Sequence, residues 1–349
     1  MAAGELANRT NASTDSDHQA AQDTVVVVLS ITVMCVVMTA AVLGNLLVIV
    51  SVALHRSLRS RTNHFIMSLA VADILVALFA MTFNFSVTLA QRWLFGQFVC
   101  DFWNSCDVLF STASILHLCC ISVDRYIAVT NPLMYPTVMT HRKVAIMLTV
   151  VWLSSALISF VPIYTQWYTT PGNYEYMLAH PDVCHFKVNR VYAVISSTVS
   201  FWLPAVVMLF TYHKVYREAN KQARQIHRET AAIQVQLGAR AADCHLADGA
   251  GNEAGRTILR REHKAEKTLG MIMGCFLICW LPFFTWYLAT HLCGDACVTP
   301  DVVVSVLFWI GYSNSGLNPI IYAFFNKDLR RGFHLTLRRL FCCRDTDHF

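Results

Sequence analysis

Charged residues are scarce in this chain: Asp, Glu, Lys and Arg make up only 14% of its 349 residues. A typical soluble domain carries roughly 25% charged residues, and apolar residues account for 55% of this sequence. This balance leaves too little charge for a water-facing surface and excludes an ordinary soluble globular protein. Lipid is therefore expected to be the solvent for most of the chain.

Signals of several other functional classes are also missing. The sequence has no internal repeat of the kind found in inverted-repeat transporters. It has no spacing that indicates a nucleophile with its base, or a cluster of metal ligands. The fingerprint-like run "GAGNEA" follows no predicted strand, so it does not indicate a dinucleotide site. We therefore expect neither an enzyme nor a tightly bound organic cofactor.

Long apolar runs are what the chain does contain. Seven of them reach about 20 residues, enough for a helix to cross the roughly 30 Å hydrocarbon core of a membrane. They cover residues 25–54, 64–89, 99–129, 143–163, 190–213, 268–291 and 301–325. The sequence predicts an all-α membrane protein, a seven-transmembrane helix bundle. The basic and apolar pattern of 326–343 adds a short amphipathic helix on the membrane surface.

Basic residues are distributed unevenly across this predicted bundle. Of the 27 Lys and Arg residues, 23 fall on one side. Cytoplasmic loops carry the excess of Lys and Arg, so we expect a multi-pass plasma-membrane protein with its N-terminus outside and its C-terminus inside. The same asymmetry accounts for the net charge of +5 and gives no indication of nucleic-acid binding.

The chain is predicted to divide into three parts. Residues 1–24 form a polar extracellular tail, 25–341 the seven-helix domain, and 342–349 a cytoplasmic tail. The first part lacks the apolar core of a cleavable signal peptide, so the first span is expected to serve as the targeting signal. Within the domain, the Ala- and Gly-rich residues 230–256 are predicted to form a mobile cytoplasmic insert.

Four of the 13 cysteines lie at the predicted outer face. Cys100 begins the third span and Cys184 is the only cysteine of the second outer loop, so an oxidising compartment favours their pairing. Cys293 and Cys297, in "CGDAC", offer a second disulfide.

Two kinds of covalent modification are predicted at the ends of the chain. Asn8 and Asn11 begin the sequons "NRT" and "NAS" and are candidates for glycosylation. Cys342 and Cys343 follow the basic amphipathic stretch, which favours palmitoylation, with reduced thiols as the alternative.

One carboxylate, Asp107 in "NSCDVLFST", lies inside the third apolar run. A charge at the centre of a bilayer costs about 2.5 kcal/mol or more, so it marks a functional site by default. No Lys or Arg lies in the apolar body of another span, so the partner of Asp107 is expected to be a ligand cation or a proton. Ser111 and Ser114 share its face of the helix.

Aromatic residues of the sixth and seventh spans match the needs of an aromatic amine. Rings near a carboxylate stabilise an ammonium group and pack a ligand ring. The alternative is that these rings only form helix-packing core. The residues are Trp280, Phe283, Phe284 and Tyr287, with Trp309 and Tyr312 in the seventh span.

The fifth span carries three serines, Ser196, Ser197 and Ser200. They are candidates for hydrogen bonding to a ligand hydroxyl. The alternative is that each serine bonds a carbonyl of its own helix, as serines in membrane helices often do.

A second buried carboxylate, Asp73, lies in the second span. Ser114, Asn314 and Ser315 are polar groups of other spans that are expected to surround it. Such an oxygen-rich cluster suits a small hard cation, here an allosteric sodium ion. A water-filled hydrogen-bond network is the alternative.

The inner end of the third span reads Asp124-Arg125-Tyr126, and Glu262 lies at the start of the sixth span. An arginine that shares acidic partners from two helices can hold those helices together and then release them. Prolines such as Pro319 interrupt several spans and provide pivots. The pattern is typical of a device that signals from an outer pocket to an inner latch.

The motifs "GNLLVI", "LAVAD", "DRY", "CWLP" and "NPIIY", each in its proper span, closely resemble those of the rhodopsin-like G-protein-coupled receptors. The acid at 107 with the serines of the fifth span narrows the resemblance to biogenic amine receptors. The stretches "WYTTP" and "VLFWIGYSNSGLNP" are similar to the invertebrate β-adrenergic-like octopamine receptors. An opsin is excluded, because it needs a span-seven lysine where Tyr312 stands.

The resemblance implies a role for each group. Asp107 would bind the protonated amine and the three serines its ring hydroxyl, while Phe186 would cover the pocket. The further ligand contacts implied are Val108, Ser111, Thr112, Trp280, Phe283, Phe284, Tyr287, Phe308, Trp309 and Tyr312. The implied activation switch comprises Asp124, Arg125, Tyr126, Glu262, Asn318, Pro319 and Tyr322.

The implied partners are a small aryl-ethylamine agonist, with octopamine favoured, and a stimulatory heterotrimeric G protein that raises cyclic AMP. Arrestin, a receptor kinase and membrane lipid are implied as well. A dopamine, tyramine or serotonin receptor of the same fold is the alternative. Tyr287 and Phe308 stand where vertebrate β-adrenergic receptors carry amides, which favours the invertebrate branch.

Overall fold

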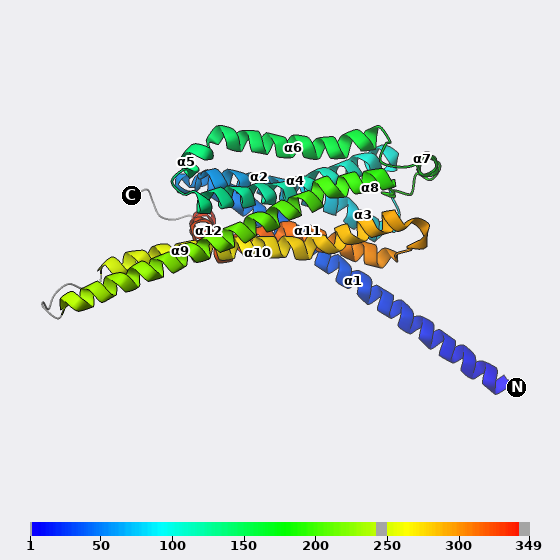
Figure 1. The fold of residues 1–349 in the computed structure, drawn as a ribbon. Helices are drawn as coiled ribbons and strands as arrows, with labels where there is room; N and C mark the ends of the chain where they lie inside the picture. The colour runs from blue at the N-terminus through cyan, green and yellow to red at the C-terminus, as the bar shows by residue number, and fades with distance from the viewer. Residues whose placement is uncertain (1, 242–249, 342–349) are drawn as a thin grey trace.

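The computed structural model describes residues 2–241 and 250–341, and the described segments form an all-helical bundle (Figure 1). The helices that make up the passes are α1 (Ala2–Leu54), α2 (Arg61–Leu75), α3 (Thr82–Ala90), α4 (Gly96–Thr130), α6 (His141–Tyr164), α8 (Arg190–Ser197), α9 (Leu203–Ala241), α10 (Ala250–Cys293) and α11 (Asp301–Phe325). Two of the passes contain π-helical turns, Val76–Met81 between α2 and α3, and Thr198–Trp202 between α8 and α9. The helices outside the passes are α5 (Tyr135–Val138), α7 (Pro171–Ala179) and α12 (Lys327–Phe341).

These helices make the seven passes that the apolar runs predict. Six of the passes are long and apolar enough to cross a membrane by their length and composition. The seventh, α11, has 25 residues, about 37 Å of helix, and packs between α1 and α10. It carries the buried polar residues Asn314, Ser315 and Asn318 in its second half.

The outward faces of the bundle are apolar, as expected for helices in lipid. On α6, large apolar side chains recur every three or four residues and are exposed. The residues are Ile146, Val150, Leu153, Leu157 and Val161. Polar side chains lie inside instead, where Asn45 of α1 donates to the backbone oxygen of Ser315 at 2.9 Å. This side-chain bond ties α1 to α11.

Small residues let the helices approach closely. A Cβ placed on Gly44 of α1 would lie 2.9 Å from the side chain of Pro319 in α11, so only glycine fits there. Pro319 lies inside α11 and removes one of its backbone hydrogen bonds. Close packing against Pro319 thus explains Gly44, the first residue of the motif "GNLLVI".

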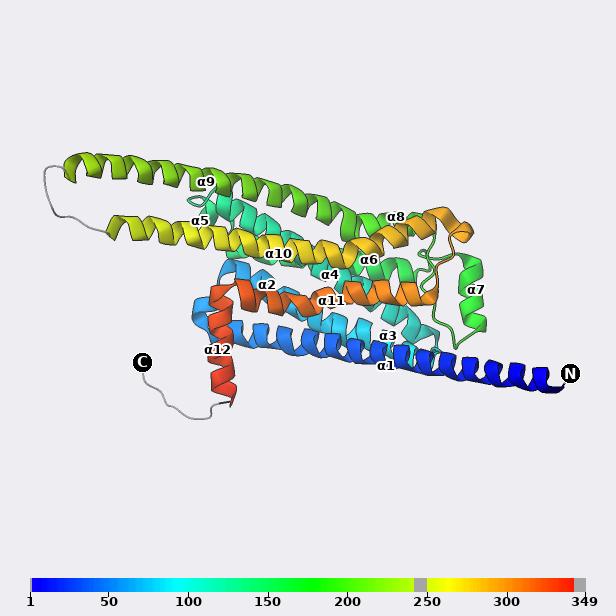
Figure 2. The ribbon, with the colours of Figure 1, turned by 90° about the horizontal axis from the view of Figure 1, so that it is seen from below.

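The two ends of the bundle differ. The helix α7 lies at the end toward which α1 projects, whereas α5 and α12 lie at the opposite end (Figures 1 and 2). Figure 2 shows α12 running across the bundle axis, as expected for a helix on the membrane surface. Its buried Thr336 bonds Ser51 of α1 at 3.0 Å, which anchors it.

Helix covers parts of two segments at the edges of the predicted helical domain. One helix, α1, includes residues 2–24 of the predicted tail as well as the first span. The helices α9 and α10 extend beyond the bundle and include 230–241 and 250–256 of the predicted insert (Figure 2). The mobility expected of this insert stays a prediction.

Candidate functional site

A cavity of about 850 Å³ lies between α4, α8, α10 and α11 and reaches α7. The helix α7 lies at the end of the bundle toward which α1 projects (Figure 1). All of the predicted ligand contacts except Ser197 and Trp309 line the cavity. Those residues are Asp107, Val108, Ser111, Thr112, Phe186, Ser196, Ser200, Trp280, Phe283, Phe284, Tyr287, Phe308 and Tyr312. Helices far apart in the sequence therefore bring one carboxylate, several hydroxyls and a group of rings to one space.

Asp107 is half-buried on α4 and accepts two hydrogen bonds from hydroxyls. Tyr312 on α11 donates to Oδ2 at 2.9 Å, and Ser111, one turn along α4, donates to Oδ1 at 3.4 Å. Among the described residues no basic side chain forms an ion pair with this carboxylate. Hydroxyl donors thus orient a carboxylate that has no counter-ion among the residues that the structure describes.

A hydroxyl-bearing wall lies at the fifth pass. The Oγ1 atom of Thr112 donates to Oγ of Ser200 at 2.8 Å, and Oγ of Ser196 lies 3.3 Å from the hydroxyl of Tyr287. Ser200 belongs to the π-helical turn between α8 and α9, and such turns are frequent at functional sites. Ser196 and Ser200 therefore each contact a residue of another helix.

Ser197 does not belong to this wall. Its side chain is fully buried outside the cavity and donates to the backbone oxygen of Val194 at 3.2 Å. Adjacent helix residues point about 100° apart, so Ser196 and Ser197 cannot share one face. For Ser197 the structure favours the alternative of a bond within its own helix.

The aromatic side chains form one connected group around Phe283. Its ring centre lies 4.8 Å from that of Phe308, 5.9 Å from that of Tyr287 and 6.0 Å from that of Trp280. The neighbouring Phe284 stacks in parallel on Phe201 at 4.6 Å. The rings therefore both pack the sixth pass and line the cavity.

Trp309 is the second predicted contact that lies elsewhere. Its Nε1 atom donates to Oδ1 of Asn84 on α3 at 2.9 Å, and its ring packs between α11 and the second pass. Trp309 and Tyr312 are three residues apart, but only Tyr312 reaches the cavity. Trp309 is a helix-packing residue here.

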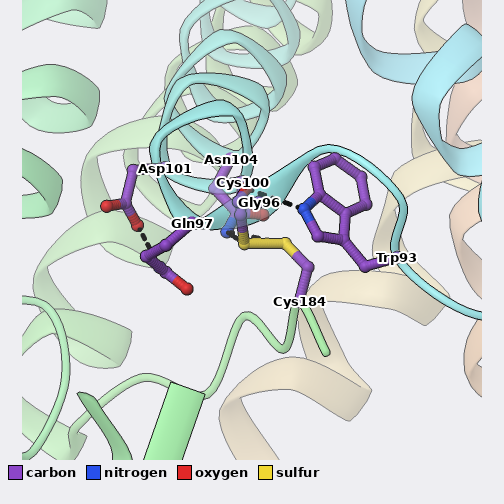
Figure 3. The surroundings of a disulfide bond; sticks show 7 residues. All are labelled: Trp93, Gly96, Gln97, Cys100, Asp101, Asn104 and Cys184. Atoms are coloured by element: carbon purple, nitrogen blue, oxygen red, sulfur yellow. Dashed lines mark hydrogen bonds between the residues drawn. A yellow bond between two sulfur atoms is a disulfide. The ribbon is translucent and has the colours of Figure 1, made fainter. Parts of the chain in front are cut away.

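The segment between α7 and α8 is tied to α4 by the Cys100–Cys184 disulfide, whose Cα atoms lie 5.8 Å apart (Figure 3). The side-chain nitrogen of Asn104 lies 3.5 Å and 3.8 Å from the two sulfurs. The second predicted disulfide, Cys293–Cys297, is formed as well. The first bridge holds the segment that follows Cys184, including Phe186, beside the cavity.

Phe186, two residues after Cys184, lines the cavity and stacks on Tyr168 at 5.6 Å. Tyr168 is fully buried in the loop, and this burial raises its pKa above its ordinary value, so the ring stays neutral. An uncharged aromatic platform therefore supports the residue that was predicted to cover the pocket.

Sequence reasoning missed much of the outer part of the cavity. Within α7, Gly172, Asn173 and Tyr176 line it, and Met177 anchors the helix in a fully buried position. The local signal was Thr170 before Pro171, a typical helix start. The other lining residues not predicted are Thr170, His185, Lys187, Tyr192, Trp286, His291 and Val304.

The carboxylate of Asp73 is fully buried and accepts three hydrogen bonds. Ser114 and Ser315 donate to Oδ1 at 2.8 and 2.9 Å, and Asn318 donates to Oδ2 at 2.8 Å. Asn314, predicted for this cluster, does not bond Asp73, and its amide nitrogen has no partner in the described part of the chain. Asn318, predicted for the switch, takes that place one helical turn further along.

Near the C-terminal end of α4, Arg125 pairs with Asp124 at 2.7 Å. Asp124 also accepts from Thr62 at 2.7 Å and from the hydroxyl of Tyr135 at 2.8 Å, while Arg125 donates to Thr62 as well. Glu262 belongs to α10, but its side chain lies outside the described residues, so its contact with Arg125 stays a prediction.

The remaining predicted positions are distributed as follows. Tyr126 is half-buried at the end of α4, and Tyr322 is fully buried in α11. The side chains of Asn8 and Asn11, in α1, are not described, and Cys342 and Cys343 lie outside the described residues.

A bundle of seven passes with a half-buried carboxylate in a cavity near one end and an acid–arginine pair at the other end is the architecture of a membrane receptor. Residues 44–322 match the 7 transmembrane receptor (rhodopsin family). The chain belongs to this family, and it is a multi-pass membrane protein and a receptor rather than an enzyme.

The chain is also similar to individual receptors of this family. Octopamine receptor beta-1R of Drosophila melanogaster is 55% identical over 308 residues, covering 87% of this chain and 60% of that protein. Octopamine receptor beta-2R of the same organism is 51% identical over 338 residues, covering 92% and 63%. The human Histamine H2 receptor is 37% identical over 341 residues, covering 97% and 84%. The chain thus spans about six-tenths of the length of these two octopamine receptors.

Proposed function

We propose that this protein is a receptor for a small aryl-ethylamine, with octopamine as the favoured agonist. The observation that carries the proposal is Asp107, which lies in the outer cavity without a basic partner among the described residues. An ammonium group supplies the missing positive charge, and the surrounding rings stabilise it by cation–π attraction. The names of two relatives, at 55% and 51% identity, favour octopamine among the amines.

The rest of the cavity matches the rest of such a ligand. Ser196 and Ser200 supply hydroxyls for a ring hydroxyl group, and Phe283 and Phe284 supply faces for the ring. The volume of about 850 Å³ lies within the usual range of small-molecule pockets, about 300–1,000 Å³. Dopamine, tyramine and serotonin, like octopamine, carry an amine group and a hydroxylated aromatic ring, so they are the alternative agonists.

We place the end that carries α7 outside the cell and the end that carries α12 inside. The support is the one-sided distribution of Lys and Arg over the loops. In this orientation Asn8 and Asn11 are available for glycosylation and Cys342 and Cys343 for palmitoylation. Membrane lipid then contacts the apolar face of α12.

The output proposed is coupling to a stimulatory G protein, raised cyclic AMP, and later contact with a receptor kinase and arrestin. The network of Asp124, Arg125, Thr62 and Tyr135 supports a resting latch, because it fixes the arginine to the second and third passes. Release of that arginine on agonist binding would open the inner end to a partner. Glu262 is proposed as the acid that draws α10 into the same latch.

We also propose a sodium ion at Asp73. The carboxylate is fully buried, its bonds come from neutral groups, and no basic side chain of the described chain pairs with it. Ser114 and Ser315 supply hydroxyl oxygens beside it, which suits a hard cation. A bound sodium ion would neutralise the charge that these hydrogen bonds only solvate.

A cyclic AMP panel tests the proposed agonist. Cells that express the receptor are titrated with octopamine, tyramine, dopamine, serotonin, noradrenaline and histamine. We expect octopamine to act at the lowest half-maximal concentration and all responses to depend on Asp107. A response to another amine at lower concentration would reassign the agonist, and no response to any amine would contradict the proposal. Asp124→Asn, measured without agonist, should raise basal cyclic AMP.

A further inference from the structure

Octopamine and tyramine differ in one group, the hydroxyl that octopamine carries on the carbon between its ring and its aminomethyl group. The proposed function assigns a partner to the amine and to the ring hydroxyl, but none to this side-chain hydroxyl. In a staggered gauche conformation the side-chain oxygen lies beside the nitrogen, because the two atoms are bonded to neighbouring carbons. A partner for the side-chain hydroxyl therefore has to lie beside the group that binds the amine, Asp107.

Few groups of the cavity lie beside the carboxylate of Asp107. Val108 follows it in α4, and the ring centre of Phe308 lies 5.9 Å from that of Tyr312. Val108 and Phe308 both line the cavity, but neither has a polar side-chain atom. Among the described residues, the hydroxyls of Tyr312 and Ser111 are the only side-chain groups that bond this carboxylate. These two hydroxyls are therefore the candidates for the partner.

The two hydroxyls differ in how firmly they are held. Tyr312 is nearly fully buried, and its one proton is committed to Oδ2 of Asp107 at 2.9 Å. Ser111 is half-buried, and its Oγ atom lies 3.4 Å from Oδ1, beyond the usual range of about 2.5–3.0 Å for a hydroxyl donor. No other hydrogen bond of Ser111 is found in the described part of the chain. Its hydroxyl is therefore able to turn toward a ligand oxygen.

The neighbouring hydroxyls of the cavity are engaged with one another. The Oγ1 atom of Thr112 donates to Ser200 at 2.8 Å, and Oγ of Ser196 lies 3.3 Å from the hydroxyl of Tyr287. A serine hydroxyl has one donor and two acceptor positions, so Ser111 can accept from a ligand hydroxyl or donate to it. Ser111 is thus the loosely held hydroxyl at the amine end of the cavity.

The order of these groups along α4 matches the order of groups along the ligand. Asp107 comes first, Ser111 follows one turn later on the same face, and Thr112 comes next and contacts Ser200. A β-hydroxylated aryl-ethylamine presents its amine, then its side-chain hydroxyl, then its ring with the ring hydroxyl. A ligand whose amine binds Asp107 and whose ring hydroxyl reaches Ser200 places its hydroxylated side-chain carbon beside Ser111.

We propose that Ser111 recognises the side-chain hydroxyl of the agonist and so selects β-hydroxylated aryl-ethylamines over amines that lack this group. The inference rests on the proposed function and adds the residue that decides between octopamine and tyramine. Ser111 approaches the carboxylate of Asp107 at Oδ1, while Tyr312 occupies the Oδ2 side. Only one of the two enantiomers of octopamine directs its hydroxyl to the Ser111 side, so the same residue makes binding stereoselective.

The test measures competition binding of four amines in two matched pairs. Octopamine and tyramine form one pair, and phenylethanolamine and phenethylamine form the other; the members of each pair differ only in the side-chain hydroxyl. The full-length receptor is compared as the wild type, as Ser111→Ala, and as Ser111→Thr, which keeps a hydroxyl. Ser197→Ala is the control, since Ser197 is buried outside the cavity and bonds the backbone of Val194.

We expect the wild type to bind the hydroxylated member of each pair more tightly. Ser111→Ala should weaken octopamine and phenylethanolamine about fivefold, the loss typical of one neutral hydrogen bond, and leave tyramine and phenethylamine nearly unchanged. The affinity ratio of the two octopamine enantiomers should fall by the same factor. Ser111→Thr should keep the preference, and Ser197→Ala should bind all four amines as the wild type does.

Two results would overturn the inference: a wild type that binds both members of each pair equally, or an equal loss of both members in Ser111→Ala. An equal loss would mean that Ser111 only positions Asp107. Both results leave the amine site intact, whereas the absence of any amine binding that depends on Asp107 would overturn the proposed function and this inference with it.

An antibody against an epitope tag counts the receptor at the cell surface for each variant. Should Ser111→Ala not reach the surface, Ser111→Cys carries the test. Its side chain has nearly the same shape and only a weak donor, so the same selective loss of octopamine and phenylethanolamine is expected. Equal losses of all four amines in Ser111→Cys would contradict the inference.

Discussion

The hydroxyl of Tyr312 donates a 2.9 Å hydrogen bond to Oδ2 of Asp107, and this bond joins α11 to α4 at the cavity that both residues line. Tyr312 is only 1% exposed, so its ring is fixed by packing. An opsin would carry its lysine at this position, whereas here a neutral donor holds the carboxylate, and in our proposal the ligand supplies the positive charge.

Tyr312→Phe removes that donor while it keeps the ring. We expect about a tenfold loss of octopamine affinity, because a hydrogen bond to a charged group contributes about 1.5–3 kcal/mol. Competition binding measures it. Trp309→Phe is the matched control, since Trp309 lies three residues away on α11 and outside the cavity. Equal affinities for Tyr312→Phe and the wild type would show that the bond does not position Asp107.

Ser196→Ala and Ser200→Ala test the hydroxyl wall. Each should weaken octopamine about fivefold, in line with about 1 kcal/mol for a neutral hydrogen bond, and leave phenethylamine nearly unchanged. Ser197→Ala should affect neither amine, because its hydroxyl bonds the backbone of Val194. If both amines lose affinity equally, the serines act on packing and not on a ring hydroxyl.

The two disulfides should differ in their effect on stability. Cys100–Cys184 spans 84 residues and Cys293–Cys297 only 4, so loop-closure entropy gives about 4–5 kcal/mol for the first and about 2 kcal/mol for the second. Cys184→Ser should therefore lower the unfolding temperature more than Cys297→Ser. It should also weaken amine binding, since it releases Phe186. The reverse order in a thermal unfolding assay would contradict this explanation.

Sodium should lower agonist affinity through Asp73. The ion would stabilise the resting arrangement and oppose agonist binding by linkage. Competition binding in sodium chloride, compared with choline chloride at equal ionic strength, measures the effect. Asp73→Asn should abolish it. A wild-type receptor that responds equally to both salts would favour the water-filled network instead.

Much of the site follows from the sequence because the membrane makes buried charge conspicuous. Asp107 and Asp73 are recognisable because a charge within an apolar run is costly. The spacing of the aromatic residues Trp280, Phe283, Phe284 and Tyr287 places these four side chains on one face of a helix. The boundaries of the spans follow from length and composition for the same reason.

The errors arise where one helical step or one turn decides the outcome. Ser197 and Trp309 lie beside true lining residues but point to other neighbours, and Asn318 takes the bond to Asp73 that Asn314 was expected to make. The local sequence does not determine how a helix is rotated about its axis relative to its neighbours. The lining by α7 was missed because a polar outer loop has no lipid-facing pattern that would orient it.

Amine affinity of Asp107→Asn is the most direct test of the central claim. The amide has nearly the same shape and can still accept from Tyr312, but it carries no charge for an ammonium group. Saturation and competition binding are measured on intact cells, with surface receptor counted by an antibody against an epitope tag. We predict that surface expression persists and that high-affinity octopamine binding is lost. Unchanged amine affinity in this variant would contradict the assignment of Asp107 as the counter-ion of the ligand.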